Sequence, residues 1–288
     1  MKASIPYHIG CSSWNVSSRI GTFYANKSKS DDLLGQYASV FNSVEICKNI
    51  RELPTAAELQ LWDESTPEGF KFCINLPKEL THKQLLENVE VQALAFVDSF
   101  ESIRNKLGPF LIRLPHNFDY SLFKRLEELL SILPKTYSYA VEVQHADFFD
   151  HGNSEHKLEL LLKSYGVDRF ISDTRKLHAT KSISPAIEIA RQKNPSLPLR
   201  FGATASRPVV RYLGTNDILN NEVYLREWAI VVADWIKEGL HPYVIIQTPD
   251  VTSEYILSTH FHRLLAGLIK ISPLNEWPAN REPQLGLF

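Results

Sequence analysis

The chain has 288 residues, 44% of them hydrophobic and 22% charged, which is enough for a globular protein with a sizeable core. A formal net charge of −2 excludes nucleic-acid binding through a global positive field, so any such binding requires a local basic patch. No apolar run reaches the roughly 20 residues that cross a membrane, and three cysteines without a secretory leader predict a cytoplasmic protein.

Short runs rich in β-branched and aromatic residues alternate with segments of helical periodicity, the pattern of successive βα units. We expect strands at residues 7–11, 43–47, 70–76, 109–114, 139–143, 169–173, 209–214 and 242–247. Segments with a helical pattern are residues 31–41, 83–107, 120–133, 154–166, 184–194, 222–239 and 253–269. Eight such units predict an α/β fold, a (β/α)8 TIM barrel forming a single domain over residues 1–275. We expect residues 276–288 to form an extended C-terminal tail.

The second expected strand contains a carboxylate where a hydrophobic residue is expected. Glu45 lies within the run "FNSVEICKN", which otherwise has the pattern of a short buried strand. An ionised side chain that leaves water costs several kcal/mol unless it is paired. The sequence therefore predicts a partner for Glu45, and we expect an arginine from the other side of the barrel.

Polar side chains also occur in or just after most of the other expected strands. In a parallel barrel the C-terminal strand ends form the mouth where active sites are built. Carboxylates and a histidine can transfer protons there, and arginines bind phosphate or carboxylate groups. The candidate catalytic residues are Glu45, Glu142, His145 and Asp173. The candidate substrate-binding residues are Trp14, Asn75, Arg113, Arg211 and Gln247.

Structural interpretations of the same residues remain open. Carboxylates and arginines inside a barrel can neutralise one another as a plug without any chemistry. A single loop histidine such as His145 is usually a surface or structural residue. Cys11, Cys47 and Cys73 lack CxxC spacing and are expected to be small buried hydrophobic residues. The sequence thus predicts no metal site and identifies no cofactor.

Several stretches, in their order and spacing, resemble the DUF72 family, also called YecE-like proteins. They are "IGCSSW", "GTFY", "YASVFNSVEI", "TPEGFKFCINLP", "THKQLL", "LGPFLIRLPHNF" and "YAVEVQHADFF". The resemblance covers nearly the whole chain and implies a TIM barrel. It implies no reaction, because no biochemical activity is established for the family.

The chain departs from the usual pattern of that family at several positions that carry cations. The resemblance implies a lysine in place of Asn75, a glutamine in place of Arg113 and an arginine in place of Gln144. The positions that match the pattern are Glu45, Glu142, His145 and Arg211. We therefore expect a rearranged set of cationic partners, with either an altered substrate preference or a lost activity.

The last five residues, "QLGLF", resemble the pentapeptide by which bacterial DNA-processing proteins dock on the replication sliding clamp. In such a peptide Leu285, Leu287 and Phe288 are apolar anchors and Gln284 sets the register. The alternative is a hydrophobic tail that packs on its own barrel.

Two functions remain after these observations. The first is a cytoplasmic enzyme of hydrolase or lyase type that acts on an anionic substrate, such as a sugar phosphate or a nucleic-acid fragment. Arg113 and Arg211 would bind the anion, and the carboxylates with His145 would transfer protons. The second is a non-catalytic ligand-binding module, or an accessory of DNA metabolism held on a sliding clamp by its C-terminal peptide.

Overall fold

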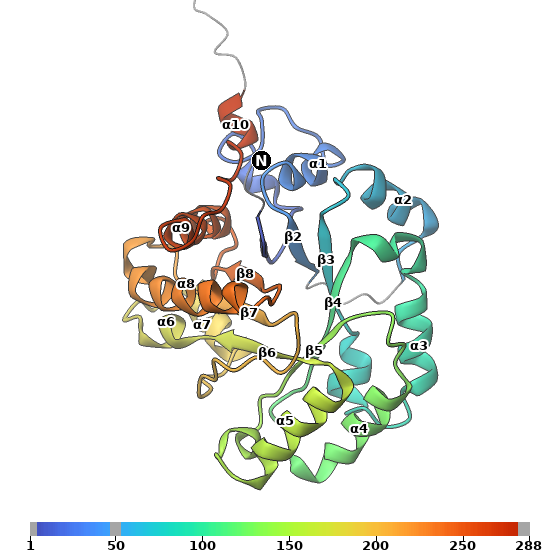
Figure 1. Cartoon of the computed structure of the whole chain (residues 1–288). Helices are drawn as coiled ribbons and strands as arrows, with labels where there is room; N and C mark the ends of the chain where they lie inside the picture. The colour runs from blue at the N-terminus through green and yellow to red at the C-terminus, as the bar shows by residue number, and fades with distance from the viewer. Residues whose placement is uncertain (1–4, 47–52, 282–288) are drawn as a thin grey trace, which may run out of the picture.

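Eight parallel strands close into one barrel in the order in which they occur in the chain (Figure 1). The computed structural model describes residues 5–46 and 53–281. The strands are β1 (His8–Cys11), β2 (Ser43–Ile46), β3 (Lys71–Asn75), β4 (Leu107–Arg113), β5 (Tyr139–Glu142), β6 (Asp168–Asp173), β7 (Val209–Leu213) and β8 (Tyr243–Gln247). The expected (β/α)8 TIM barrel is confirmed, and all eight strands lie where the sequence predicts them.

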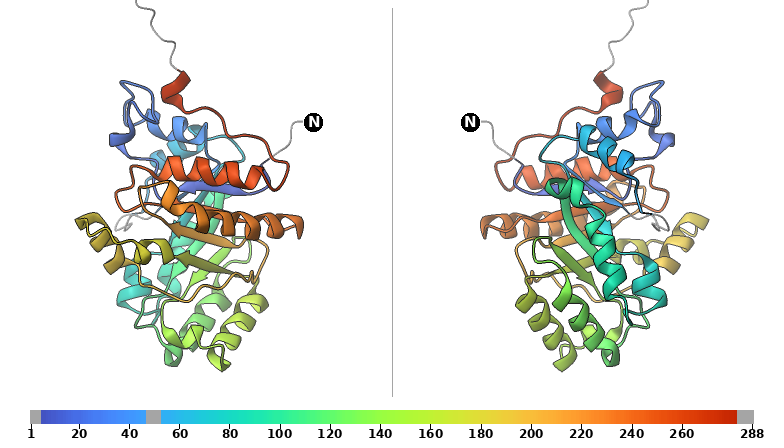
Figure 2. Two further views of the ribbon diagram at one scale, coloured as in Figure 1. Left: turned by 90° about the vertical axis from the view of Figure 1, so that its left-hand side faces the viewer. Right: turned by 90° about the vertical axis from the view of Figure 1, so that its right-hand side faces the viewer.

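Helices surround the barrel and cover the apolar outer faces of its strands (Figures 1 and 2). They are α1 (Asp32–Ala38), α2 (Ala56–Glu64), α3 (Glu90–Asp98), α4 (Phe123–Ile132), α5 (Asn153–Tyr165), α6 (Arg175–Ala179), α7 (Pro185–Lys193), α8 (Glu222–Lys237), α9 (Glu254–Ala266) and α10 (Pro278–Arg281). Leu177 of α6 and Ile187 of α7 pack on Leu213 at the C-terminal end of β7. Within the described ranges, every helix is too short or too polar to cross a membrane.

The barrel interior consists of an apolar layer followed by a polar layer. Six buried residues from different strands form the apolar layer: Cys73, Leu111, Ala140, Phe170, Val209 and Tyr243. Alternate residues of a strand face the same side, so the next inward position is two residues further along. Those positions are Asn75, Arg113, Glu142, Ser172, Arg211 and Ile245. The polar layer therefore lies toward the C-terminal mouth, where the strand ends were expected to converge.

Two pairs of adjacent strands are paired over only a few residues. In the register, β1 meets β2 through Gly10↔Ser43 and Cys11↔Val44. Similarly, β5 meets β6 only through Ala140↔Asp168 and Val141↔Arg169. The pair β7 and β8, by comparison, stays in register from Val209 to Leu213. Among the described residues, these two short junctions, which we call seams, are the least extensively paired parts of the barrel wall.

The single helix predicted over residues 83–107 is present only in part, as α3 (Glu90–Asp98). A π-helical turn, η2 (Glu79–Lys83), precedes α3, and a 3-10 helix, η3 (Glu101–Lys106), follows it. Between η2 and α3 the backbone is left-handed at Leu85 and Leu86, with φ of 48° and 60°. Leu86 lies in the main hydrophobic core, so side-chain burial overrides helix propensity in this segment.

Part of the expected tail is folded onto the barrel. Trp277 packs edge to face against Tyr255 at 4.8 Å between ring centres, and the backbone N–H of Ala279 donates to Phe23 at 3.0 Å. The residues from Pro278 to Arg281 form α10. The packing of the partly buried Trp277 therefore joins residues 276–281 to the barrel body, whereas the predicted docking residues Gln284 to Phe288 lie outside the described residues.

Candidate functional site at the barrel mouth

Glu45 is paired with an arginine from the other side of the barrel, as predicted. Arg211 of β7 donates from Nε to Glu45 Oε2 at 2.9 Å and from Nη2 to Oε1. The side chains are 1% and 0% exposed. Asn75 adds a third bond from Nδ2 to Oε1 at 3.0 Å, and the Arg211 guanidinium lies 4.8 Å from the ring centre of Phe170. Arg211 is thus enclosed and already neutralised.

A second ion pair lies nearer to the solvent. Arg113 of β4 and Glu142 of β5 are register partners, and Arg113 Nε donates to Glu142 Oε2. The glutamate side chain is 3% exposed and the arginine side chain 21%. In the described part of the chain, neither Nη1 nor Nη2 of Arg113 has a hydrogen-bond partner. Arg113 therefore presents two donors that a ligand can use.

Both interior glutamates are ionised at neutral pH. Burial alone would raise the pKa of Glu142, but the charges of Arg113 and Arg211 lower that pKa to about 2. Burial likewise opposes ionisation of Glu45, yet the charge and hydrogen bonds of Arg211 hold its pKa below the usual value. Neither carboxylate is therefore protonated and able to act as a general acid near neutral pH.

Asp173 does not share this interior, contrary to the expectation of a common cavity. It lies one residue out of phase with the inward-facing Ser172, and its carboxylate accepts from Trp228 Nε1 of α8 at 2.8 Å. Arg175 donates to it from Nε at 3.0 Å and from Nη2 at 2.9 Å. These contacts place Asp173 between the barrel and its outer helices, where it fixes α8 rather than facing a ligand.

The remaining predicted residues lie apart from one another. Trp14 packs edge to face on Trp62 of α2, with ring centres 5.4 Å apart, so it belongs to the outer wall. His145 is partly exposed and lies 3.3 Å from Asp147 through Nδ1, without a hydrogen bond or ion pair to Glu142. Gln247 shares the inward phase of Tyr243 and is half-buried at the mouth. Of these three, only Gln247 faces the polar layer.

Three cationic or imidazole side chains near Arg113 are missing from the sequence prediction. Lys78 and His82 follow β3, and His116 follows β4. Lys78, Arg113, Glu142 and His116 are the charged or titratable groups that act on the pKa of His82. The strand-end rule that selected His145 applies equally to Lys78 and His116, whereas His82 lies in a π-helical turn just before the expected helix over residues 83–107.

His82 is held in an unusual backbone environment. It lies in η2, and π-helical turns occur frequently at functional sites. Its Nδ1 lies 2.8 Å from Thr81 Oγ1. Burial, followed by the charges of Lys78 and Arg113, lowers the pKa of His82 to about 4. His82 is therefore a neutral imidazole at neutral pH, close to two cations.

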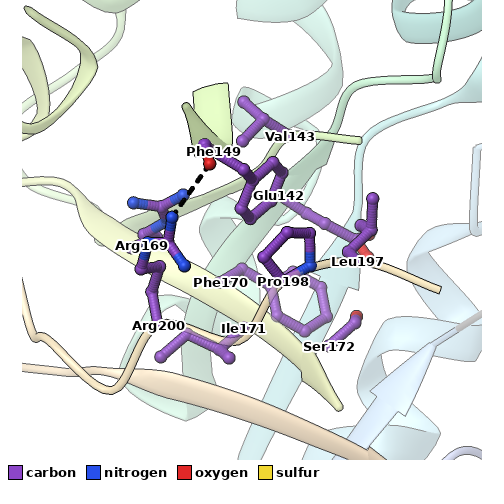
Figure 3. Close-up of a pocket in the computed structure, with 10 residues that line it drawn as sticks. All are labelled: Glu142, Val143, Phe149, Arg169, Phe170, Ile171, Ser172, Leu197, Pro198 and Arg200. Atoms are coloured by element: carbon purple, nitrogen blue, oxygen red, sulfur yellow. Dashed lines mark hydrogen bonds between the residues drawn. The ribbon is translucent and has the colours of Figure 1, made fainter. Parts of the chain in front are cut away.

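A small cavity lies at the β5–β6 seam, beside Glu142 (Figure 3). Its volume of about 20 Å³ is enough for one water molecule. The lining residues are Glu142, Val143, Phe149, Arg169, Phe170, Ile171, Ser172, Leu197, Pro198 and Arg200. Arg200 closes the outer side by donating from Nη2 to the carbonyl oxygen of Phe149 at 3.0 Å. The cavity is too small for a substrate, so the candidate site is the mouth itself.

Within residues 5–46 and 53–281, no group of three His, Cys, Asp or Glu side chains is placed to bind a metal ion. Cys11 and Cys73 are buried and unpaired. Burial raises the pKa of both thiols to about 12, so they stay protonated. This arrangement matches the small buried hydrophobic residues expected at these positions, and Cys47 lies outside the described residues.

The closed barrel and its polar, charge-paired mouth define a TIM-barrel protein of the (β/α)8 class. The chain belongs to the DUF72 family: the model described as "Protein of unknown function DUF72" matches residues 8–281. The UPF0759 protein YecE of Escherichia coli K12 is 31% identical over 218 residues, which cover 76% of this chain and 80% of YecE.

Solved structures of the same family share the fold. A DUF72 family protein from Thermotoga maritima MSB8 aligns with a TM-score of 0.65 and 17% identity, over 90% of this chain and 98% of its own. A DUF72 family protein from Enterococcus faecalis V583 aligns with a TM-score of 0.66 and 15% identity, over 93% and 98% of the two chains. At this level of identity the likeness shows the barrel alone.

Proposed function

We propose that the chain is a cytoplasmic enzyme of hydrolase or lyase type that acts on an anionic substrate at the barrel mouth. A sugar phosphate or a nucleic-acid fragment has suitable chemistry. The observation that carries the proposal is the partly exposed guanidinium of Arg113, whose Nε holds Glu142 while Nη1 and Nη2 have no hydrogen-bond partner among residues 5–46 and 53–281. Paired donors of this kind bind phosphate or carboxylate oxygens in a bidentate manner.

The two arginines have different roles in this proposal. Arg211 is enclosed and neutralised by Glu45, so it shapes the interior without touching the substrate. Arg113 binds the anion directly. Glu142 keeps Arg113 in place and stays ionised, so it can accept a proton or stabilise positive charge during a reaction.

The experiment is a thermal-shift screen of phosphorylated and carboxylated metabolites and short oligonucleotides, using wild type and Arg113→Gln. We expect at least one anionic class to raise the melting temperature of wild type only. Arg226→Gln is the control, because Arg226 is 65% exposed and pairs with Glu222 within the outer helix α8. Equal responses from wild type and Arg113→Gln to every anion would remove the proposed site.

A second candidate function concerns the C-terminal peptide. The family match ends at residue 281, and the predicted docking residues Gln284 to Phe288 follow it. This position favours an added docking segment over a part of the shared barrel. We propose that the peptide binds the groove of a replication sliding clamp through its apolar anchors.

The test is a calorimetric titration of a sliding clamp with the intact protein and with a Leu287→Ala, Phe288→Ala double variant. Binding by the intact protein, weakened at least tenfold in the variant, is expected because a few buried apolar anchors dominate such interfaces (about 1.4 kcal/mol per tenfold). Binding should change little with salt concentration. No binding, or equal binding by both proteins, would leave the peptide without this role.

A further inference from the structure

We propose that the outer face of α8 is an interface between two copies of this chain, which pair with α8 antiparallel about a two-fold axis at Ile230. In the left view of Figure 2, α8 and α9 lie side by side on the face turned to the viewer. This face belongs to the outer ring of helices, so the inference is separate from the function proposed for the barrel mouth.

Five exposed residues form one stripe along α8. They are Val223, Arg226, Ile230, Asp234 and Lys237. Their successive spacings of three, four, four and three residues keep them on one face of a helix with 3.6 residues per turn. The same spacings are symmetric about Ile230. Each position on one side of Ile230 therefore faces a stripe position of the other copy when two such helices pair antiparallel about a two-fold axis.

The apolar residues of this face are strongly exposed. Val223 is 76% exposed and Ile230 is 54% exposed. Leu219, one turn before Val223 in the 3-10 helix η6 (Leu219–Asn221), is 83% exposed, the highest value among the large hydrophobic residues of the described chain. One exposed apolar residue is ordinary, but three in line along one helix make a continuous apolar strip. A second copy of α8 would cover this strip.

The charges of the stripe are complementary under the two-fold axis. Arg226 and Asp234 lie four residues before and after Ile230, so Arg226 of each copy lies over Asp234 of the other. Within one chain, Arg226 pairs with Glu222 at 2.5 Å. Asp234 pairs with Lys237 at 2.9 Å. These exposed pairs contribute little, so they can be exchanged for contacts between the copies, which place two opposite-charge pairs around an apolar centre.

A groove beside the C-terminal half of α8 also fits the other copy. Its volume is about 500 Å³, and residues 202–205 form its opposite wall. From α8 and the turn after it come Val231, Asp234, Trp235, Glu238 and Leu240. Three of these side chains are apolar and two carry carboxylates, so the groove suits a cation on an apolar stem. Asp234 belongs to both the stripe and the groove, and Arg226 of the other copy therefore lies at this groove.

The contact should be weak and closed. An interface formed mainly by one helix of each copy belongs to the small class, below about 1,200 Å² in total. We expect a dissociation constant on the order of 10–100 µM. Because the two-fold axis uses the same surface on both copies, association stops at the dimer.

The first experiment is sedimentation velocity of the full-length chain at about 5–500 µM, a range that brackets the expected dissociation constant. Wild type should pass from monomer to dimer across this range. Ile230→Asp places two like charges opposite each other on the axis and should weaken the dimer at least tenfold. Leu160→Asp is the matched control, because Leu160 is 53% exposed on α5, and it should leave the dimer unchanged. Both positions are exposed, so both variants should fold.

The second experiment exchanges the charges. Arg226→Asp places two carboxylates opposite each other at each charge pair, and Asp234→Arg places two guanidinium groups there. Each variant alone should therefore dimerise at least tenfold more weakly than wild type. In an equimolar mixture both pairs between the copies are attractive, so the mixture should dimerise about as tightly as wild type. This rescue requires that the two positions face each other across the interface.

Three results would overturn the interface. They are a wild type that stays monomeric at the highest concentration, equal effects of Ile230→Asp and Leu160→Asp, and no gain of dimer on mixing the two charge variants. A monomer whose α8 face binds a different protein would count against the proposal as well. Anion binding is tested independently, since Arg226→Gln should respond to anions like wild type in either oligomeric state.

Discussion

The two interior ion pairs of this barrel differ in what they leave open. Glu45 and Arg211 satisfy each other and have almost no contact with solvent, whereas Nη1 and Nη2 of Arg113 at the mouth have no partner in the described part of the chain. A buried pair of the first kind contributes little net stability, but losing one partner strands the other charge. The first pair is therefore structural, and the second is the part of the interior available to a ligand.

Removal of the Glu45 charge tests the structural pair. Glu45→Gln is expected to lower the free energy of unfolding by about 3 kcal/mol or more, because Arg211 loses its counter-charge in a buried position. Urea denaturation measures the change. Glu128→Gln, which removes an exposed pair with Lys124 at 3.6 Å, should change the same quantity by less than about 1 kcal/mol. A Glu45→Gln protein as stable as wild type would contradict the pairing.

Acid should weaken the fold through Glu142. Its pKa is about 2 in the folded protein and about 4.3 in an unfolded chain, so its stabilising effect is complete above the unfolded value. That effect is lost as the pH falls through the folded pKa, and amounts to about 3 kcal/mol. Urea denaturation from pH 7 to pH 2 should therefore show a shallower pH dependence for Glu142→Gln than for wild type. Parallel curves would show that the carboxylate has no such role.

At the residue scale the sequence predicts charge pairing better than side-chain direction. Glu45 stands out because a carboxylate interrupts an apolar run, and the same reasoning leads to its arginine partner. Asp173 stands out equally, but β6 is buried on both faces, so the sequence does not show which alternate residues point inward. The outward direction of Asp173 follows from its contact with Trp228, which lies far away in the chain.

At the element scale, the strands follow from the sequence and some of the helices do not. Each strand is a short apolar run, and this signal survives in a fully buried parallel sheet. The prediction between β3 and β4 is partly wrong. The apolar residues there have helical spacing, but a π-helical turn and left-handed residues precede α3. Leu85 and Leu86 fall within the predicted helix, so the helical spacing does not show that α3 begins only at Glu90.

Helix α2 has a sequence signal that the periodicity does not reveal. Thr55 caps the helix, and Thr55 with Glu58 forms a reciprocal capping box, visible in the sequence as "TAAE". Thr55→Ala should lower the free energy of unfolding by about 1 kcal/mol, because the Glu58 N–H loses its acceptor. Thr55→Ser should keep most of the wild-type free energy of unfolding, measured by urea denaturation. Equal losses in the two variants would argue against the cap.

At the scale of the whole molecule, the seams divide the wall into two groups of four strands. One group runs from β2 to β5, and the other contains β6, β7, β8 and β1. Glu45, Arg113 and Glu142 belong to the first group and Arg211 to the second. The interior charges therefore do not balance within either group, and the pair of Glu45 with Arg211 joins them.

This division has a consequence for the order of events in folding. A four-stranded half that formed alone would carry an uncompensated charge on a surface that is otherwise apolar, so we expect the halves to close late and in one register. Interactions made after the transition state affect unfolding rather than folding. In stopped-flow measurements, Glu45→Gln should therefore speed unfolding by about 100-fold and leave the folding rate nearly unchanged. A slowed folding rate would instead mean that the halves meet early, with the carboxylate and the guanidinium guiding their encounter.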